Sequence, residues 1–487
     1  MFEPIDQLVA ARNGAKSEEE KLALAYLSLI TRLGHFCLFC GETVIPDPLL
    51  ILGEDLSSVI MKGFSTLKDY QGIVHEEGYW YFQRRYKEEK TIIEHYQRLL
   101  SSIPSIQADL REVVQKDEEL LEEQKEAIIE AGRQAVTLIT GGPGTGKSFT
   151  AAKLIHYLTL VHPQIRIAIA APTGKAAANF SMDLVKPKTI HRLLDYRLRQ
   201  EDPTLLRIDL IIIDESSMVD STLFAQLLKS IGSGTRLVLL GDPYQLPPVE
   251  GGAVFHDLIE WHKKEGCGLT CLTKCRRTQL ASILELSNAV KEGDFQTVLK
   301  AVGPMDNLIE KLKIPHLNIQ MPPEELLAAF EKRVILTPLR KGRFGTQALN
   351  KACRSLYGHS GCIPIMIMRN DEDLGLANGD TAVLVKRGDH IERGDYALFR
   401  SKTGIRKIPA LLLPPFEDAY CLSVHKSQGS EYAEVIAVVP VGSERFGREL
   451  LYTAITRAKQ KVEIVGDLKS VERTVQNSYR RFSRIYC

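Results

Sequence analysis

From about residue 120 onward, short runs of apolar residues alternate with stretches in which apolar residues recur at helical spacing. Four of these runs have the length of a strand, and each is followed by a turn containing Gly, Pro or Asp: residues 136–140, 167–171, 210–213 and 237–240. Apolar residues follow one another directly in these runs, which is typical of strands buried on both faces of a parallel sheet. The pattern therefore predicts an α/β fold in which helices flank a parallel sheet.

A second α/β block follows the first one. Its predicted strands are residues 334–336, 435–439 and 462–465. Between the first and second of these, three further apolar segments predict a small insertion of β-strands: residues 381–385, 396–400 and 408–413. The chain is thus expected to carry two α/β lobes, the second of them interrupted.

The first 108 residues or so differ in character and are predicted to form a separate module. Apolar residues recur at helical spacing over 22–33, and the aromatic stretch 78–82 predicts a short strand or one arm of a hairpin. No constellation of catalytic side chains is visible in this part of the sequence.

Composition narrows the class of protein. The chain has 487 residues with a formal net charge of +1, and 44% of its residues are hydrophobic and 25% charged, as in ordinary globular proteins. No apolar run reaches the roughly 18–20 residues that span a bilayer, and no signal peptide opens the chain, so a cytoplasmic protein without membrane contact is expected. A near-zero net charge does not exclude nucleic acid as a partner, because basic grooves are local.

The nine cysteines do not indicate a disulfide framework, since their number is odd in a long chain. Cys37 and Cys40 have the spacing of half a zinc site, but no second such pair exists to complete four ligands. Buried thiols are the favoured interpretation, and a zinc site the weaker one.

The strongest local motif is a phosphate-binding loop between the run 136–140 and a helical pattern. It reads Gly141, Gly142, Pro143, Gly144, Thr145, Gly146, Lys147 and Ser148, which fits G-x-x-x-x-G-K-[ST] in its expected strand–loop–helix context. Backbone N–H groups of such a loop wrap phosphates, the lysine reaches the β- and γ-phosphates, and the serine hydroxyl ligates Mg²⁺. The motif predicts an NTPase that binds ATP and Mg²⁺.

Two acidic residues complete a hydrolytic site. Asp214 and Glu215 directly follow the apolar run 210–213. Asp214 is predicted to hold Mg²⁺, and Glu215 to activate the attacking water as a general base. An acidic pair after a strand is often only a helix cap, but its pairing with a P-loop favours catalysis.

A third strand end carries Gln245 in the stiff loop Gly-Asp-Pro-Tyr-Gln-Leu-Pro-Pro, residues 241–248. Its amide is predicted to sense the γ-phosphate. With this loop, the ordered set of motifs resembles the RecD family of superfamily 1B DNA helicases, the alpha subunits of exodeoxyribonuclease V (RecBCD), from about residue 109 to the end.

The resemblance implies a domain organisation. It comprises an N-terminal partner-docking domain (1–108), a RecA-like motor lobe with a short pin at about 195–207 (109–275), a second RecA-like lobe (276–375 and 419–487) and an SH3-like insertion (376–418). In the family the N-terminal domain docks onto RecC.

The resemblance also implies further residues around ATP. These are the adenine-reading Gln124, together with Phe149, Gly429 and Glu431, the γ-phosphate contact Arg277 and the arginine finger Arg457. Arg276 is an alternative to Arg277. Since Arg457 lies more than 300 residues beyond the P-loop, it can reach ATP only if two lobes close around it, and such closure would drive a motor.

Motifs that the family places on single-stranded DNA are present as well. They contain Pro172, Thr173, Gly174 and Lys175, then Thr189 and His191, and then Ser423, His425, Lys426 and Gln428. Small donors and cations of this kind suit contacts to a phosphate backbone without base readout. For each histidine taken alone, a core or capping role is at least as good an interpretation.

The resulting hypothesis is an ATP-driven 5′→3′ translocase and helicase that acts on single-stranded DNA and duplex ends, with RecB-like and RecC-like subunits as partners. The polarity comes from the resemblance, and the short pin leaves translocation better supported than unwinding. A stand-alone RecD-like helicase is the alternative. A subunit whose ATPase is a switch or is silent, and a P-loop enzyme outside nucleic-acid work, have less support.

Overall fold

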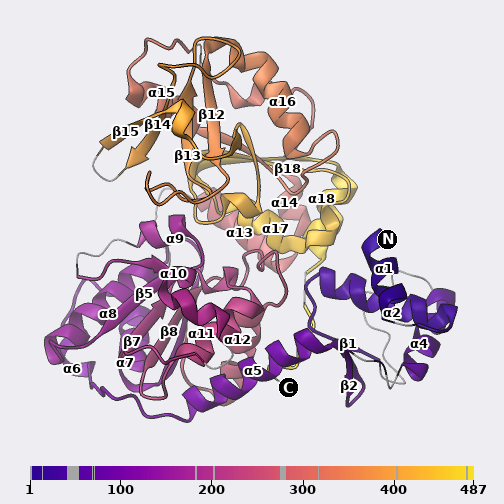
Figure 1. Cartoon of the computed structure of the whole chain (residues 1–487). Coiled ribbons are helices and arrows are strands. Elements are labelled where there is room, and N and C mark those ends of the chain that lie inside the picture. The colour runs from indigo at the N-terminus through magenta and orange to yellow at the C-terminus, as the bar shows by residue number, and fades with distance from the viewer. Residues whose placement is uncertain are drawn as a thin grey trace.

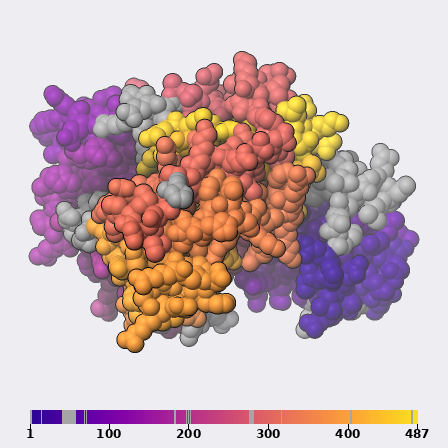
Figure 2. Space-filling model, turned by 90° about the horizontal axis from the view of Figure 1, so that it is seen from above, coloured from indigo at the N-terminus to yellow at the C-terminus, as the bar shows by residue number. Residues whose placement is uncertain are grey.

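The computed structural model describes residues 3–13, 15–40, 54–67, 70, 72–180, 184–200, 203–274, 281–315, 317–401, 404–478 and 481–486. These residues are organised around a parallel six-stranded sheet, a parallel five-stranded sheet, an antiparallel five-stranded sheet and a small antiparallel N-terminal sheet (Figure 1). Viewed from above, the antiparallel insertion lies in front, with the first lobe on one side and the N-terminal module on the other (Figure 2).

The first lobe is built on the six-stranded sheet, in the order β6-β5-β7-β8-β4-β9. Its strands are β4 (Val136–Gly141), β5 (Ile167–Ala171), β6 (Lys188–Thr189), β7 (Leu210–Ile213), β8 (Arg236–Gly241) and β9 (Leu269–Leu272), all paired in parallel. The four strands predicted from apolar runs are confirmed. Every residue of β4, β7 and β8 is buried, which explains why their sequences show no polar alternation.

Helices cover both faces of this sheet. They are α6 (Arg111–Gln115), α7 (Glu122–Arg133), α8 (Lys147–Val161), α9 (Gly174–Asn179), α10 (Ile190–Leu194), α11 (Ser221–Ser230) and α12 (Val254–Glu265). In β7, Ile211 and Ile213 pack into a core with α11 and α12, whereas Leu210 and Ile212 pack into a second core with α7 and α8. The sheet is therefore a middle layer, and its loops at the carboxyl ends of the strands are left to form a site.

The second lobe contains the parallel sheet β10-β19-β18-β11-β17. Its strands are β10 (Val302–Gly303), β11 (Arg333–Thr337), β17 (Cys421–Ser423), β18 (Tyr432–Val439) and β19 (Ala458–Gly466), and its helices include α13 (Ala281–Glu292), α14 (Phe295–Leu299), α15 (Pro323–Glu331), α16 (Thr346–Tyr357), α17 (Gly447–Ile455) and α18 (Leu468–Gln476). The predicted strands of the second block are confirmed, and the chain carries two RecA-like lobes.

The insertion is an antiparallel sheet in the order β15-β14-β13-β12-β16. Its strands are β12 (Cys362–Ile367), β13 (Thr381–Val385), β14 (Tyr396–Ser401), β15 (Gly404–Pro409) and β16 (Phe416–Asp418). This sheet begins before the predicted boundary at residue 376, because β12 pairs with β13 along its length from Cys362 to Met366. Residues 378–380 lie between β12 and β13, and so the predicted boundary falls inside the sheet.

One predicted strand of the insertion, 408–413, is wrong. The ladder between β14 and β15 ends where Pro409 faces Tyr396, and a 3-10 helix, Ala410–Leu412, follows. Leu411 and Leu412 are exposed, so this apolar run is not a buried strand.

The N-terminal module has its own small core. It consists of α1 (Pro4–Arg12), α2 (Glu18–Arg32), α4 (Glu54–Thr66), β1 (Leu38–Phe39), β2 (Ile73–Glu76) and β3 (Tyr79–Phe82). The aromatic stretch forms one arm of the β2–β3 hairpin, as predicted. The next helix, α5 (Gln83–Leu100), runs from this module to the first lobe (Figure 1), where Ile92, Tyr96 and Leu99 enter the lobe's core. A separate module reaching residue 108 is therefore wrong, because α5 packs as part of the first lobe.

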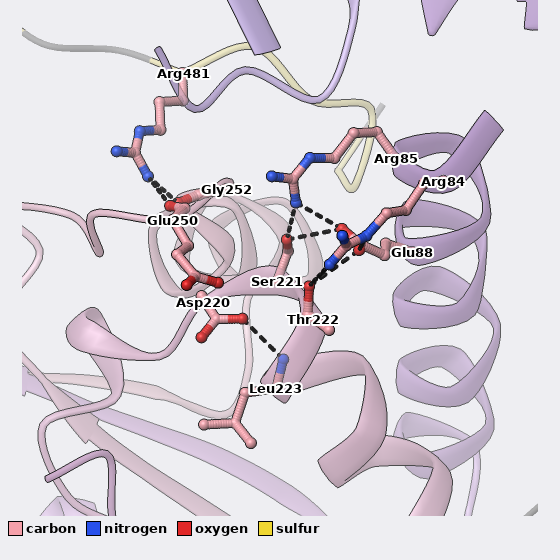
Figure 3. A network of polar contacts seen from close by, with 10 residues as sticks. All are labelled: Arg84, Arg85, Glu88, Asp220, Ser221, Thr222, Leu223, Glu250, Gly252 and Arg481. Atoms are coloured by element: carbon pink, nitrogen blue, oxygen red, sulfur yellow. Dashed lines mark hydrogen bonds and ion pairs between the residues drawn. The ribbon is translucent and has the colours of Figure 1, made fainter. Parts of the chain in front are cut away.

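Polar contacts hold α5 and the C-terminus on this lobe (Figure 3). The Glu88 carboxylate accepts hydrogen bonds from Arg84 and Arg85 of its own helix and from Ser221 and Thr222 of α11. Nearby, Arg481 donates to the carbonyls of Glu250 and Gly252.

Residues 481–486, here called the C-terminal strap, connect the second lobe back to both other parts. The backbone N–H of Phe482 donates to Nδ1 of His35 at 3.0 Å, and the backbone N–H of Phe36 donates to the carbonyl of Phe482 at 2.9 Å. The backbone N–H of Arg484 donates to Glu89 at 2.9 Å, and Ile485 is buried in the core of the first lobe. The strap thus fills the junction between the N-terminal module and the first lobe.

Candidate nucleotide site

The P-loop connects β4 to α8, and its backbone depends on glycines. Gly144 and Gly146 have φ values of +77° and +88°, in the left-handed region that disfavours side chains. Gly146 is the N-cap of α8, so Lys147 and Ser148 open the helix with their N–H groups unpaired by the helix itself. Nζ of Lys147 donates to the carbonyls of Gly141 and Gly142, at 2.7 and 3.2 Å. The loop therefore presents N–H groups and a cation at a helix N-terminus, which is a phosphate site.

Gln124 lies behind this loop. Its side chain is fully buried, with Nε2 donating to the carbonyl of Thr145 at 3.2 Å and Oε1 accepting from the N–H of Leu121 at 3.1 Å. A Cβ on Gly146 would lie 2.6 Å from Nε2 of Gln124. In this structure the predicted adenine-reading residue thus braces the P-loop backbone and does not line the cleft.

Asp214 and Ser148 face each other next to the loop. Oγ of Ser148 donates to Oδ2 of Asp214 at 3.2 Å. Burial, reinforced by the neighbouring Glu215 carboxylate, raises the pKa of Asp214 above its usual range. A hydroxyl and a destabilised carboxylate are oxygen ligands that suit Mg²⁺, whose charge would offset this electrostatic cost. The donor set therefore fits the metal that the P-loop implies.

Glu215 is held in an unusual backbone conformation, with φ of +52°. Its Oε2 is buried and has no hydrogen-bond partner among the described residues. A strained, non-glycine residue with an unpaired carboxylate oxygen is expected at a functional site more than in a structural turn.

The P-loop, Asp214 and Glu215 line one cleft of about 570 Å³ between the two lobes. From the first lobe it is lined by Pro143, Gly144, Gly146, Lys147, Ser148, Phe149, Lys175, Ala176, Asn179, Asp214, Glu215 and Gln245, and from the second by Gly429, Ser430, Glu431, Arg457 and Lys459. The structure thus brings Lys147 and Arg457, far apart in sequence, to the same cleft.

Arg457 is held in place by the second lobe. Only 4% of it is exposed, and its guanidinium donates to the carbonyls of Thr453 and Ser430, at 3.2 and 3.4 Å. Its hydrogen-bond partners among the described residues are carbonyl and hydroxyl oxygens, so the buried charge is costly, and an anionic phosphate in the cleft would compensate it.

The sequence reasoning missed two cleft residues whose side chains make polar contacts. Asn179 donates from Nδ2 to the carbonyl of Gly429 at 2.8 Å and so connects α9 of the first lobe to the second. Lys459 pairs with Glu431 at 3.0 Å. The signal was available, because Asn179 lies one helical turn after Lys175 and Lys459 lies two residues after Arg457. Arg277 and Arg276 lie outside the described residues.

The predicted DNA contacts of the first lobe take different positions. Pro172 and Gly174 flank Thr173, whose hydroxyl caps α9, and Lys175 faces the nucleotide cleft, where burial lowers its pKa. Thr189 caps α10, and His191 is exposed. Within the predicted pin, residues 195–199 form a 3-10 helix, and Leu206 makes an isolated bridge to Ile231.

In the second lobe, Ser423 accepts a hydrogen bond from the N–H of Lys426, whose exposed ammonium pairs with Glu417 at 2.9 Å. His425 is half-buried, and burial lowers its pKa to about 4. Gln428 is buried and donates to the carbonyl of Leu246 in the first lobe at 3.1 Å. Among the predicted DNA contacts, His191 and Lys426 are therefore the two that present an exposed side chain.

Metal clusters and membrane helices are absent from the part of the chain that the structure describes. There, no group of three or more His, Cys, Asp or Glu side chains is arranged around a metal position, and no helix is long and apolar enough to cross a bilayer. Cys37 is buried in the N-terminal module and Cys40 is partly buried.

Comparisons with known proteins agree with this geometry. Residues 124–251 match the family model of an AAA domain, and residues 418–465 match that of a UvrD-like helicase C-terminal domain. The RecBCD enzyme subunit RecD of Mycolicibacterium smegmatis is 30% identical, over 98% of this chain and 95% of that protein. The subunit of the same name from Haemophilus influenzae is 27% identical over 83% of this chain and 79% of its own.

Two other similarities are weaker or more distant. The ATP-dependent RecD2 DNA helicase of Deinococcus radiodurans is 28% identical, over 94% of this chain and 67% of that protein. A solved structure of Pif1 helicase from Bacteroides, in complex with ADP-AlF3 and single-stranded DNA, is 17% identical and aligns over 74% of this chain and 96% of its own, with a TM-score of 0.46.

Proposed function

Because the chain belongs to the RecD family of superfamily 1B helicases, we propose that it is the 5′→3′ motor subunit of a RecBCD-type complex that processes double-strand breaks. Members of this family are ATP-dependent DNA helicases, and the proposal builds on that activity. The observation that carries the proposal is the single cleft that Lys147 lines from the first lobe and Arg457 from the second.

In the proposed reaction the chain's own residues divide the chemistry between the lobes. The P-loop N–H groups and Lys147 bind the phosphates, and Ser148 and Asp214 would hold Mg²⁺, which when bound would supply positive charge against the phosphates. Glu215 positions the attacking water and accepts its proton. Arg457 stabilises the charge that spreads over the γ-oxygens in the transition state.

Hydrolysis is coupled to motion because half of the site lies on each lobe. ATP draws the lobes together through Lys147 and Arg457, and loss of the γ-phosphate weakens that attraction. Single-stranded DNA held by both lobes would then advance one step in each cycle. The exposed His191 and Lys426, from opposite lobes, are the proposed backbone contacts.

The experiment that tests the motor is ATP hydrolysis measured with and without single-stranded DNA. We expect a low rate without DNA and a strong rise with it, and an ATPase rate indifferent to DNA would refute the motor. Polarity is read by displacement of streptavidin from oligonucleotides biotinylated at one end. Release from the 3′ end alone supports 5′→3′ movement, and release from the 5′ end alone reverses the assignment.

A stand-alone helicase is the second candidate, favoured by the similarity to the RecD2 helicase over 94% of this chain. Purification of the tagged chain from its own cells separates the two. Stable co-purification of RecB-like and RecC-like chains supports the complex. A monomer that unwinds duplex DNA at full rate by itself supports the stand-alone enzyme.

A further inference from the structure

The loop that follows β8 carries Gln245 into the nucleotide cleft and is organised by one buried carboxylate. Asp242 is fully buried, and its Oδ2 accepts hydrogen bonds from two donors. One is Nε2 of Gln245 at 3.3 Å, and the other is the hydroxyl of Tyr452 at 2.9 Å. Oδ1 accepts from the N–H of Tyr244 at 3.1 Å. A carboxylate of the first lobe thus joins a cleft residue to a tyrosine of the second lobe.

The Asp242 carboxylate also fixes which way the Gln245 amide points. An ionised carboxylate can only accept hydrogen bonds, so the amide nitrogen must face it. The remaining group, Oε1 of Gln245, is buried and has no partner among the described residues. Since an oxygen acceptor repels phosphate oxygens but accepts from water, this orientation suits Gln245 to hold the attacking water.

Tyr452 acts on this arrangement from outside the cleft. It lies in α17, is 3% exposed, and lines a neighbouring cavity of about 400 Å³ together with Gly142. Burial, reinforced by Asp242, raises the pKa of its phenol well above the usual value, so the hydroxyl stays a donor at neutral pH.

The second lobe holds the same loop at two further points. The hydroxyl of Thr453 accepts from the N–H of Leu246 at 2.8 Å, and the carbonyl of Leu246 accepts from Nε2 of Gln428 at 3.1 Å. The conformation of the loop therefore depends on contact between the lobes.

We propose that Asp242 and Tyr452 are positioning residues that orient the Gln245 amide toward the attacking water only while the two lobes are closed. This inference rests on the proposed hydrolytic role of the cleft. Opening of the lobes removes the Tyr452 donor and leaves Gln245 without its second-lobe restraint. Hydrolysis is thereby confined to the closed state, whereas nucleotide binding to the P-loop is not.

The test is a double-mutant cycle on kcat for ATP, with Tyr452→Phe, Gln245→Ala and the double variant. Loss of a hydrogen bond to a buried charge predicts a fall in kcat of about tenfold for Tyr452→Phe, with an unchanged affinity for ADP. In the Gln245→Ala background the same change should alter kcat by less than about twofold, because Tyr452 acts through Gln245.

Tyr420→Phe is the matched control, since its buried hydroxyl has no partner among the described residues. It should leave kcat unchanged, and all variants are compared by thermal unfolding. Additive effects of Tyr452→Phe and Gln245→Ala, or an unchanged kcat for Tyr452→Phe, would overturn the proposal. If DNA does not stimulate hydrolysis by the parent protein, the proposed motor function is refuted. The double-mutant cycle can still be measured on kcat without DNA, and the same outcomes then support or overturn the positioning role of Tyr452.

Discussion

Oγ of Ser148 lies 3.2 Å from Oδ2 of Asp214, so the first residue after the P-loop lysine contacts the acidic residue at the end of β7. This pair joins two neighbouring parts of the first lobe, and both side chains would hold the metal ion that the P-loop implies. Its electrostatics make the site costly to maintain without a cation, because burial raises the pKa of Asp214.

The first prediction concerns that cost. Asp214→Asn should raise the free energy of unfolding at pH 7 without Mg²⁺ or nucleotide by about 1–2 kcal/mol, and should abolish Mg²⁺-dependent hydrolysis. A carboxylate whose pKa is raised on folding loses stability as pH rises from about 4 through its folded pKa, so the gain should shrink as pH falls below that value. Urea unfolding at several pH values measures the gain in the free energy of unfolding and its dependence on pH. Equal stability of the two proteins at pH 7 would contradict the assignment.

The two cations of the cleft should separate binding from hydrolysis. Lys147→Ala should lose hydrolysis and weaken ADP binding, because Lys147 belongs to the P-loop. Arg457→Lys should lower kcat by about 100-fold or more while ADP affinity stays within about twofold, since Arg457 lies on the other lobe. Fluorescent ADP titration and steady-state hydrolysis measure the two effects. If both variants lose ADP affinity equally, the division of binding and hydrolysis between the two lobes is refuted.

Gly146→Ala tests the brace behind the P-loop. The alanine would have to adopt a φ of +88°. Its Cβ would lie 2.6 Å from Nε2 of Gln124, which would then have to give up its hydrogen bond to the carbonyl of Thr145. We expect ATP affinity to fall by about tenfold or more, with a loss of stability larger than the roughly 1–2 kcal/mol of a left-handed residue alone. Gly266→Ala is the control, because φ there is +72° and an added Cβ meets no atom within 4 Å among the described residues beyond its chain neighbours. It should show the backbone cost only and normal hydrolysis.

The C-terminal strap should contribute to stability although none of its residues lines the nucleotide cleft. Ile485→Ala leaves a cavity in the core of the first lobe and should lower the free energy of unfolding by about 2–4 kcal/mol. Leu468→Ala, at an exposed position, should change it by less than about 0.5 kcal/mol. Denaturant unfolding measures both, and a neutral Ile485→Ala would show that the strap is not packed as described.

His35 makes attachment of the strap dependent on pH. Burial lowers its pKa to about 4, and the neutral ring accepts the N–H of Phe482. The unfolded chain binds the proton more readily, so the His35 contribution should be lost as pH falls from about 6.5 to 4, by up to about 3 kcal/mol. His35→Gln should reduce the loss of stability with falling pH in this range. A smaller loss should remain, because burial also lowers the pKa of His425. An identical slope in parent and variant would contradict this assignment.

Much of the site was visible in the sequence because its chemistry is local. The spacing from Gly141 to Ser148 dictates a loop that wraps phosphate, and a buried apolar run that ends in Asp214 and Glu215 dictates acidic side chains at a strand end. Parallel strands gather such ends at one edge of the sheet, so the P-loop and the acidic pair were expected to meet.

Other features depended on packing between distant segments, which no local pattern encodes. The helical pattern of α5 is the same whether it packs within its own module or on the first lobe, and only the tertiary structure places Ile92, Tyr96 and Leu99 in that lobe. The apolar run at 408–413 looked like a strand, but the neighbouring strand β14 reaches only as far as the residue that pairs with Pro409. Sequence alone predicted which residues bind and cleave ATP. The tertiary structure decided that Arg457 shares their cleft and that Asp242 joins Gln245 to Tyr452, because these relations arise from the contact of two lobes and not from neighbours along the chain.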